Sequence, residues 1–249
     1  MSDTRTVIHS GNAIAPTSCF YNDTYEKKQW YLDGSILSPL SIDVYSVWKE
    51  YNGAGVKVGV IDSQIDFRHK DLSGAYSTAL DYNFALGTAQ VAIDPAHMPY
   101  YHGTAVAGII SAQADNGFGT VGIGSGATLV GLGIDYASNT VVSQVESALR
   151  AAAGLDVVNN SWCFLTPFAD DFALNPAYGA ALKTAAVEGR GGLGTAIVFA
   201  AGNDGAYGSS NYHNFQNSPF TIAVGAIDPD GTPASFTSLG ANVLLSTAG

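Results

Sequence analysis

The stretch VKVGVID, residues 56–62, is the clearest indication of fold class in this 249-residue chain. It is rich in β-branched residues, nearly continuous in apolar residues and closed by an aspartate. Strands that are buried on both faces have this composition, because helices cover both sides of a parallel sheet. We therefore predict a buried strand over Val56–Ile61.

Four further runs along the chain have the same composition and are also predicted to be strands: Thr128–Gly133, Asp156–Asn160, Ala196–Ala200 and Thr221–Ile227. Helix patterns lie between them: His102–Ala112, Thr140–Ala153, and a segment opened by Asn175 and Pro176 and closed near Gly189. Asn139 is the expected N-cap of the second helix, and Gly154 follows its end. Strands that alternate with helices predict an α/β fold, with a doubly wound, mostly parallel central sheet and helices on both faces.

The composition narrows the classes of function. Hydrophobic residues make up 47% of the chain and charged residues 12%, which excludes intrinsic disorder. The net charge is −11, and without basic blocks this argues against a nucleic-acid partner. No apolar run is long enough for a transmembrane segment, and no apolar signal-peptide region is visible at the N-terminus. Residues 1–39 are polar, aromatic and irregular, so we expect an N-terminal arm followed by one folded domain over 40–249.

Three polar residues stand where a parallel sheet would gather them. Asp62 follows the first strand, His102 begins a helix, and Asn203 follows the strand Ala196–Ala200. Taken alone, an aspartate at such a position is more often a cap or turn residue. A lone histidine there is usually structural, and a lone asparagine beside glycine is usually a turn residue. Together they place a carboxylate, an imidazole and an amide at the edge of the sheet where such folds build their sites.

The motifs around these residues resemble those of a known family. VGVIDSQIDFRHKDL, HGTAVAGIISA, NNSW, VFAAGNDG and SPFTIAVGAI are similar, in order, to the successive motifs of subtilisin-like serine proteases (peptidase S8). The arm NDTYEKKQWYL, the segment GRGGLGTAIVFAAGNDG and the ending FTSLGANVLLSTAG look most like the kexin/furin-type branch. The resemblance implies a subtilisin-like fold and a serine-type endopeptidase that hydrolyses peptide bonds by a Ser/His/Asp mechanism.

By this resemblance, His102 would be the general base and Asp62 would orient it, while Asn203 would donate to the oxyanion. The family's nucleophile lies in a Gly-Thr-Ser segment followed closely by a proline, and no such motif occurs here. Ser246 is read instead as a strand-end serine. We therefore expect a catalytic domain that stops before its nucleophile and is inactive alone. The alternative is a non-catalytic pseudo-protease that binds extended peptides.

The resemblance also implies a structural Ca²⁺ site. Its ligands would be two carboxylates, a side-chain amide and several carbonyl oxygens, a set that suits this cation. The residues at the family's positions are Asp23, Asp71, Gln113, Asn116, Phe118 and Thr120. The plain alternative makes Asp23 and Asp71 ordinary surface acids.

The partner implied is a peptide or protein substrate. The segment Asn160, Ser161 and Trp162, together with Asn217, matches the family's substrate-binding positions, although Trp162 alone would read as a core residue. In the kexin/furin-type branch, acidic residues that line the pocket select basic residues in the substrate. The residues that follow Trp162 include no acid, so we do not expect this selectivity here unless the loop with Asp170 and Asp171 folds back to the pocket. By family analogy we expect a secreted or cell-surface protein, and the analogy also allows an additional C-terminal domain in the full-length protein. A metallohydrolase built on Asp62 and His102 is disfavoured, because no His-Glu-x-x-His motif is present.

Overall fold

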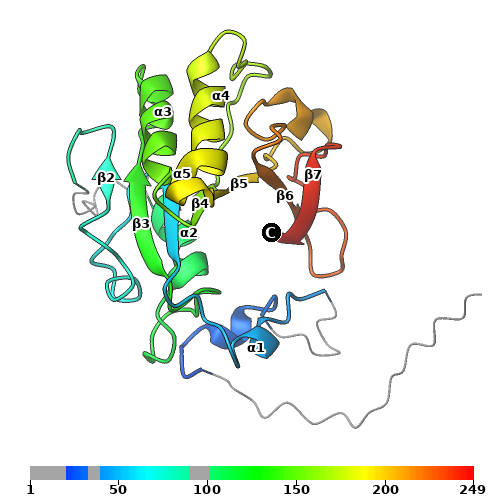
Figure 1. The fold of residues 1–249 in the computed structure, drawn as a ribbon. Coiled ribbons are helices and arrows are strands. Elements are labelled where there is room, and N and C mark those ends of the chain that lie inside the picture. The colour runs from blue at the N-terminus through cyan, green and yellow to red at the C-terminus, as the bar shows by residue number, and fades with distance from the viewer. Residues whose placement is uncertain (1–20, 33–39, 90–100) are drawn as a thin grey trace, which may run out of the picture.

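The computed structural model describes residues 21–32, 40–89 and 101–249, and these form a single parallel sheet covered by helices (Figure 1). The strands are β1 (Lys57–Asp62), β2 (Tyr82–Asn83), β3 (Thr128–Gly133), β4 (Val157–Asn160), β5 (Ala196–Ala200), β6 (Ile222–Ile227) and β7 (Val243–Ala248). Their order in the seven-stranded sheet is β2-β3-β1-β4-β5-β6-β7, and every neighbouring pair is parallel. The predicted fold class is confirmed.

The helices of the described residues are α1 (Val44–Val47), α2 (His102–Ser111), α3 (Val141–Ala152), α4 (Pro176–Lys183) and α5 (Gly189–Gly192). A π-helical stretch, Thr184–Glu188, joins α4 to α5, and short 3-10 turns occupy Glu26–Lys28, Gly205–Tyr207 and Ser210–Tyr212. None of these helices combines the length and the apolar content that crossing a bilayer requires.

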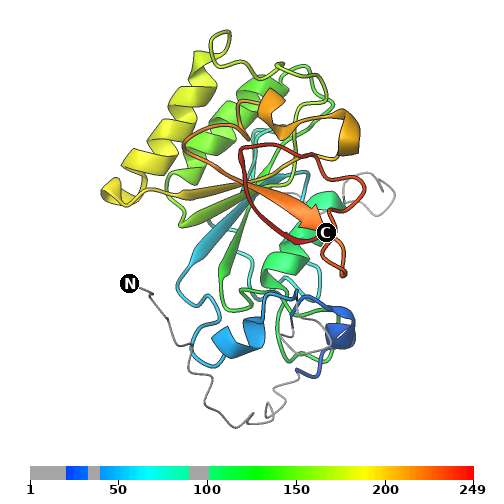
Figure 2. The same cartoon turned by 90° about the vertical axis from the view of Figure 1, so that its right-hand side faces the viewer.

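The helices lie on both faces of the sheet, as the buried strands require. Ile61 of β1 belongs to one apolar cluster, which α3 and α4 share. The preceding residue, Val60, belongs to a second cluster with Ala107 of α2. Successive side chains of a strand point to opposite faces, so one strand fills two cores. Figure 2 shows α3 and α4 on one side of the strands and α2 on the other.

The predicted strand ends hold to within one residue, while one predicted cap was wrong. Thr140, not Asn139, is the N-cap residue of α3. The Ser138 hydroxyl accepts a hydrogen bond from the Thr140 amide at 3.1 Å and so fixes the turn before the helix one residue later than expected. Asn175 does precede α4, with Pro176 at its first turn. The expectation that Ser246 lies in a strand is confirmed, since it pairs with Gly225 of β6 inside β7.

The described part of the arm, residues 21–32, is tied to the loop that follows α2. The Tyr25 amide donates to the Gly119 carbonyl at 2.7 Å. The Gln29 side chain pairs with both backbone groups of Val121, at 2.9 and 2.8 Å. A segment with little core of its own is thereby held through backbone groups. The division at residue 39 stays a prediction.

Candidate active site

Asp62 and His102 meet at the carboxyl edge of the sheet. His102 Nδ1 lies 2.8 and 2.9 Å from the two carboxylate oxygens of Asp62. Asp62 is the last residue of β1 and is fully buried, and Oδ1 also accepts the Ser63 amide at 2.7 Å. Both carboxylate oxygens thus have donors, and a buried carboxylate needs them. The structure brings these two predicted residues together.

A glycine allows the start of α2 to approach this edge. A Cβ atom at Gly103 would stand 2.5 Å from the backbone carbonyl oxygen of Ser63. The Gly103 amide instead donates to the Ser63 hydroxyl at 3.0 Å. The HGT sequence therefore serves packing as well as chemistry, because a larger residue after His102 would push the imidazole away from Asp62.

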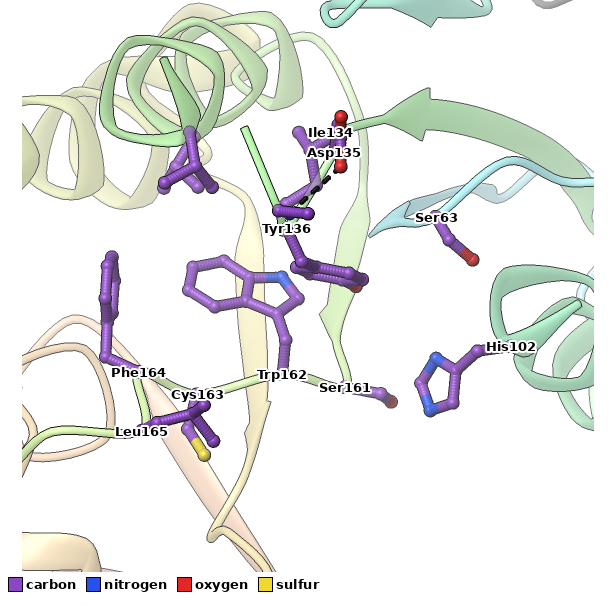
Figure 3. A pocket seen from close by; sticks show the side chains of 13 residues that line it. Ser63, His102, Ile134, Asp135, Tyr136, Ser161, Trp162, Cys163, Phe164 and Leu165 are labelled. Carbon is purple, nitrogen blue, oxygen red and sulfur yellow. Dashed lines mark hydrogen bonds between the residues drawn. The ribbon is translucent and has the colours of Figure 1, made fainter. Parts of the chain in front are cut away.

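The contact with Asp62 sets the electrostatics of the imidazole. Hydrogen bonding to Asp62 is the main cause that raises the pKa of His102 above 6.5, and the charge of Asp62 acts in the same direction. Partial burial opposes them. Figure 3 shows the His102 ring projecting into the same space as Ser161. A base oriented by a carboxylate and open on its other side can take a proton from a group in that space.

Tyr136, which the sequence reasoning missed, is a second neighbour of Asp62. It follows β3 and lines a cavity together with His102. Although 44% of the surface of Tyr136 is exposed, desolvation of its phenol and then the charge of Asp62 raise the pKa of Tyr136 above its usual value. Only the position of Tyr136 just after a buried strand could have drawn attention to it.

The cavity beside His102 has a volume of about 680 Å³ and mostly apolar walls. It is lined by Ser63, His102, Ile134, Asp135, Tyr136, Ala137, Val141, Val145, Ser161, Trp162, Cys163, Phe164 and Leu165. The stretch after β4 provides one wall and the β3–α3 loop provides the other (Figure 3). Cys163 is a free thiol, and burial raises its pKa, which leaves it in the unreactive protonated form.

The predicted substrate-binding residues are not all in this cavity. Ser161 and Trp162 line it. Asn160 is fully buried, and its side-chain amide donates to the Val198 carbonyl of β5 at 3.1 Å. Asn217 is exposed and does not line the cavity, while its backbone amide donates to the His213 carbonyl at 2.9 Å. In contrast to exposed Asn217, the preceding residue Gln216 is buried, and sequence reasoning did not single it out.

Asn203 lies in the turn after β5, on the exposed surface. Its position is fixed by the preceding glycine: Gly202 has φ +113, and a Cβ there would stand 2.8 Å from the Ser238 hydroxyl. The Gly202 carbonyl accepts the Ser238 amide at 2.9 Å. The structure thus holds this turn firmly but joins Asn203 to neither Asp62 nor His102.

Asp170, considered as a source of acid for the cleft, is fully buried and committed elsewhere. Its carboxylate accepts the Phe215 amide at 2.9 Å and lies 3.3 Å from His213 Nδ1. It therefore presents no charge to solvent at the cavity. The Asp171 carboxylate accepts a hydrogen bond from the Ala173 amide at 2.8 Å.

The residues predicted to bind calcium converge on one loop. Asp23 and Asp71 are both buried, with 6% and 3% of their surface exposed. Asp71 accepts the Asn116 side-chain amide at 2.7 Å and the Thr120 backbone amide at 3.1 Å. Asp23 accepts the backbone amides of Asp115 and Asn116 at 2.7 and 3.3 Å.

This cluster holds the kinds of oxygen that a hard cation uses, although Asn116 turns its NH2 group to Asp71 and its Oδ1 accepts the Phe118 amide at 2.8 Å. Within the described ranges, neither Asp23 nor Asp71 forms an ion pair with Lys or Arg. Two buried carboxylates without a cation are costly, and Ca²⁺ compensates such charge. Gln113 Oε1 lies in the same region, accepting the Gly74 amide at 3.2 Å, and the loop continues through Phe118. No cluster of three or more His, Cys, Asp or Glu side chains occurs in the described residues, so a metal here would depend on carbonyl and amide oxygens as well.

The fold and this edge define a parallel α/β domain that carries an aspartate-oriented histidine at the carboxyl ends of its strands. Residues 53–249 match the profile of the subtilase family (Peptidase S8), so the chain belongs to that family of serine proteases. It is 30% identical over 244 residues to neuroendocrine convertase 2 of Bos taurus, covering 91% of this chain and 36% of the relative. It is 32% identical over 212 residues to kexin of Saccharomyces cerevisiae, covering 83% and 25%.

Solved structures agree on the fold. The serine protease of Aeromonas sobria superposes with a TM-score of 0.81 at 22% identity, over 100% of this chain and 47% of that one. The nisin leader peptidase NisP of Lactococcus lactis superposes with a TM-score of 0.62 at 23% identity, over 90% and 69%. The chain spans about a third of the length of the convertase it matches.

Proposed function

We propose that this chain forms the Asp- and His-bearing part of a serine endopeptidase. The observation that carries the proposal is the contact of His102 with buried Asp62, beside a cavity of peptide-binding size. His102 would take the proton of a serine hydroxyl and return it to the leaving amine, while Asp62 would hold the imidazole in one tautomer. Asn203, on its exposed turn, would donate to the oxyanion.

The nucleophile is the part that these 249 residues do not supply. They contain no Gly-Thr-Ser segment followed by proline, and Ser246 is engaged in β7. We propose that sequence beyond residue 249 contributes the serine and that the chain by itself does not hydrolyse peptides. Reaction with a fluorophosphonate probe tests this, because the probe labels only an activated serine.

Labelling of a longer protein that contains the downstream sequence, and loss of labelling on His102→Ala, are the expected results. The 249-residue chain should stay unlabelled. A longer protein that is also unlabelled, or a gene that ends without the motif, would leave the pseudo-protease as the better account. The missing motif is the one observation that favours this second function, in which the cavity would only bind extended peptides.

The walls of the cavity support a preference for apolar side chains. Ile134, Val141 and Val145 lie on one side and Phe164 and Leu165 on the other. Asp170 is withdrawn and bonded. We propose an apolar or mixed preference, and a peptide-library profile dominated by arginine would contradict it.

We also propose a structural calcium ion held by Asp23, Asp71, Gln113, Asn116 and the carbonyl oxygens of Phe118 and Thr120. When bound, the ion would supply the positive charge that the two buried carboxylates lack and would lock the arm onto the loop after α2. It has no place in the chemical step. We place the whole protein outside the cell or at its surface, as an expectation from family membership.

A further inference from the structure

The pairing of β4 with β5 stops just before β4 runs into the wall of the cavity. The ladder runs from Val157 opposite Ala196 to Asn160 opposite Phe199. Beyond it, β4 continues into the cleft segment, which we define as residues 161–165, and β5 continues into the β5 turn, residues 200–203. The cleft segment lines the cavity and the β5 turn carries Asn203. Because the ladder has ended, something other than ladder hydrogen bonds must set the distance between these two segments.

One side chain spans this gap. Gln216 Nε2 lies 3.2 Å from the Trp162 carbonyl oxygen and 3.3 Å from the Ala200 carbonyl oxygen. Both neighbours are acceptors, and the two hydrogens of a primary amide can serve one each. The orientation of the amide follows from this, because the flipped form would crowd three oxygens together.

Gln216 is in a position to resist displacement. Only 2% of its surface is exposed. The backbone carbonyl of Gln216 accepts a hydrogen bond from the Asn242 side-chain amide at 2.9 Å. The backbone amide of the preceding residue, Phe215, donates to the Asp170 carboxylate. The amide oxygen Oε1 is buried and has no partner among the described residues. An unsatisfied acceptor in the interior is costly. Loss of either bond made by Nε2 would leave a further buried polar group of this side chain without a partner.

We propose that Gln216 is a positioning residue that fixes the separation of the cleft segment from the β5 turn. Trp162 lies in the first and Asn203 in the second. Gln216 therefore sets where the backbone of a bound peptide lies relative to the oxyanion donor. The part concerning bound peptide rests on the proposed function, whereas the part concerning the two segments does not.

Gln216→Glu tests the proposal, because it keeps the shape of the side chain and replaces the double donor by an acceptor. Two quantities are measured on the 249-residue chain: the hydrogen-exchange rate of the Trp162 indole N–H, which donates to the Ile61 carbonyl from within the cleft segment, and the dissociation constant of an extended apolar peptide. At neutral pH we expect faster exchange in the cleft segment and roughly tenfold weaker binding, the size of one lost buried hydrogen bond. Both should partly recover as the pH falls, since a protonated carboxyl can donate to one carbonyl.

Gln29→Glu is the matched control. Gln29 is a buried glutamine of the arm, and its side-chain amide donates to the Val121 carbonyl. It should lower overall stability without changing exchange in the cleft segment. If Gln216→Glu fails to fold, Gln216→Met, which removes the donors without adding charge, replaces it.

Unchanged exchange in the cleft segment of a folded Gln216 variant would overturn the proposal. A parental chain that binds no peptide, yet shows the exchange response in the variant, would count against the proposed function alone and support the role of Gln216.

Discussion

The indole Nε1 of Trp162 donates a hydrogen bond to the backbone carbonyl of Ile61, 3.0 Å away. Ile61 precedes Asp62, so the cleft segment is joined directly to the strand that carries the buried carboxylate. The same indole packs edge-on against Phe199 and Phe215, with ring centroids 5.1 and 5.4 Å away. Trp162 is therefore both a core residue and a link between the cavity and the Asp–His pair.

Replacing Trp162 by Phe should keep much of the aromatic packing and remove the donor to Ile61. We expect the free energy of unfolding to fall by about 1–3 kcal/mol, because the Ile61 carbonyl loses its buried partner. Urea denaturation measures this. Trp48→Phe is the matched control, since its indole donates to the Ile123 carbonyl at 2.8 Å in a different part of the molecule. Only Trp162→Phe should also shift the imidazole resonances of His102, and a shift of equal size in both variants would contradict the link.

The Asp62–His102 contact should make stability depend on pH. The pKa of His102 is raised in the folded state, so protons bind the folded chain more tightly than the unfolded one. The stabilisation is fully present below the ordinary histidine pKa of about 6.5 and is lost as the pH rises through the raised folded value. Asp62→Asn should remove this dependence and lower the pKa of His102.

Measuring the unfolding free energy on both sides of that window, together with an NMR titration of the imidazole, checks this prediction. Asp230→Asn removes an exposed carboxylate whose pKa is lowered by its hydrogen bonds to Thr232, so it should leave the profile unchanged within the histidine window. A His102 pKa that is the same in the parental chain and in Asp62→Asn would show that the contact does not form in solution.

Much of this site could be predicted from sequence, and the limit is physical. The strand ends fix where Asp62 and Asn203 lie, because parallel strands bring their carboxyl ends to one edge. The runs of β-branched residues gave those ends to within one residue. Tyr136 also follows a strand, but nothing in the sequence marks it as a neighbour of Asp62. Gln216 could not be found this way, since it acts through contacts with segments that are distant in the chain. The N-cap of α3 was missed because Ser138 and Asn139 are equally good formers of the turn.

Tyr136→Phe tests the second neighbour of Asp62. The negative charge of Asp62 acts on the phenol and helps to raise its pKa, so removal of the hydroxyl leaves more of that charge to His102. We expect the pKa of His102 to rise further, as followed by NMR, with little change in the apolar wall of the cavity. Tyr207→Phe, at a fully exposed tyrosine, is the control. A fall in the His102 pKa would mean that the phenol does not share the charge of Asp62.

Calcium should stabilise the chain through the arm. Adding Ca²⁺ should raise the melting temperature, and a chelator should lower it, because the ion would bind the folded state alone and offset the charge of buried Asp23 and Asp71. Asp71→Asn should lower the affinity for Ca²⁺ and with it the response to chelator, whereas Glu50→Gln, at an exposed acid outside the cluster, should retain both. Thermal melts with and without chelator, and calorimetric titration with Ca²⁺, measure the effect. If the parental chain shows no heat of binding and no change in melting temperature, the carboxylates are held by their amide donors alone, and the calcium site must be abandoned.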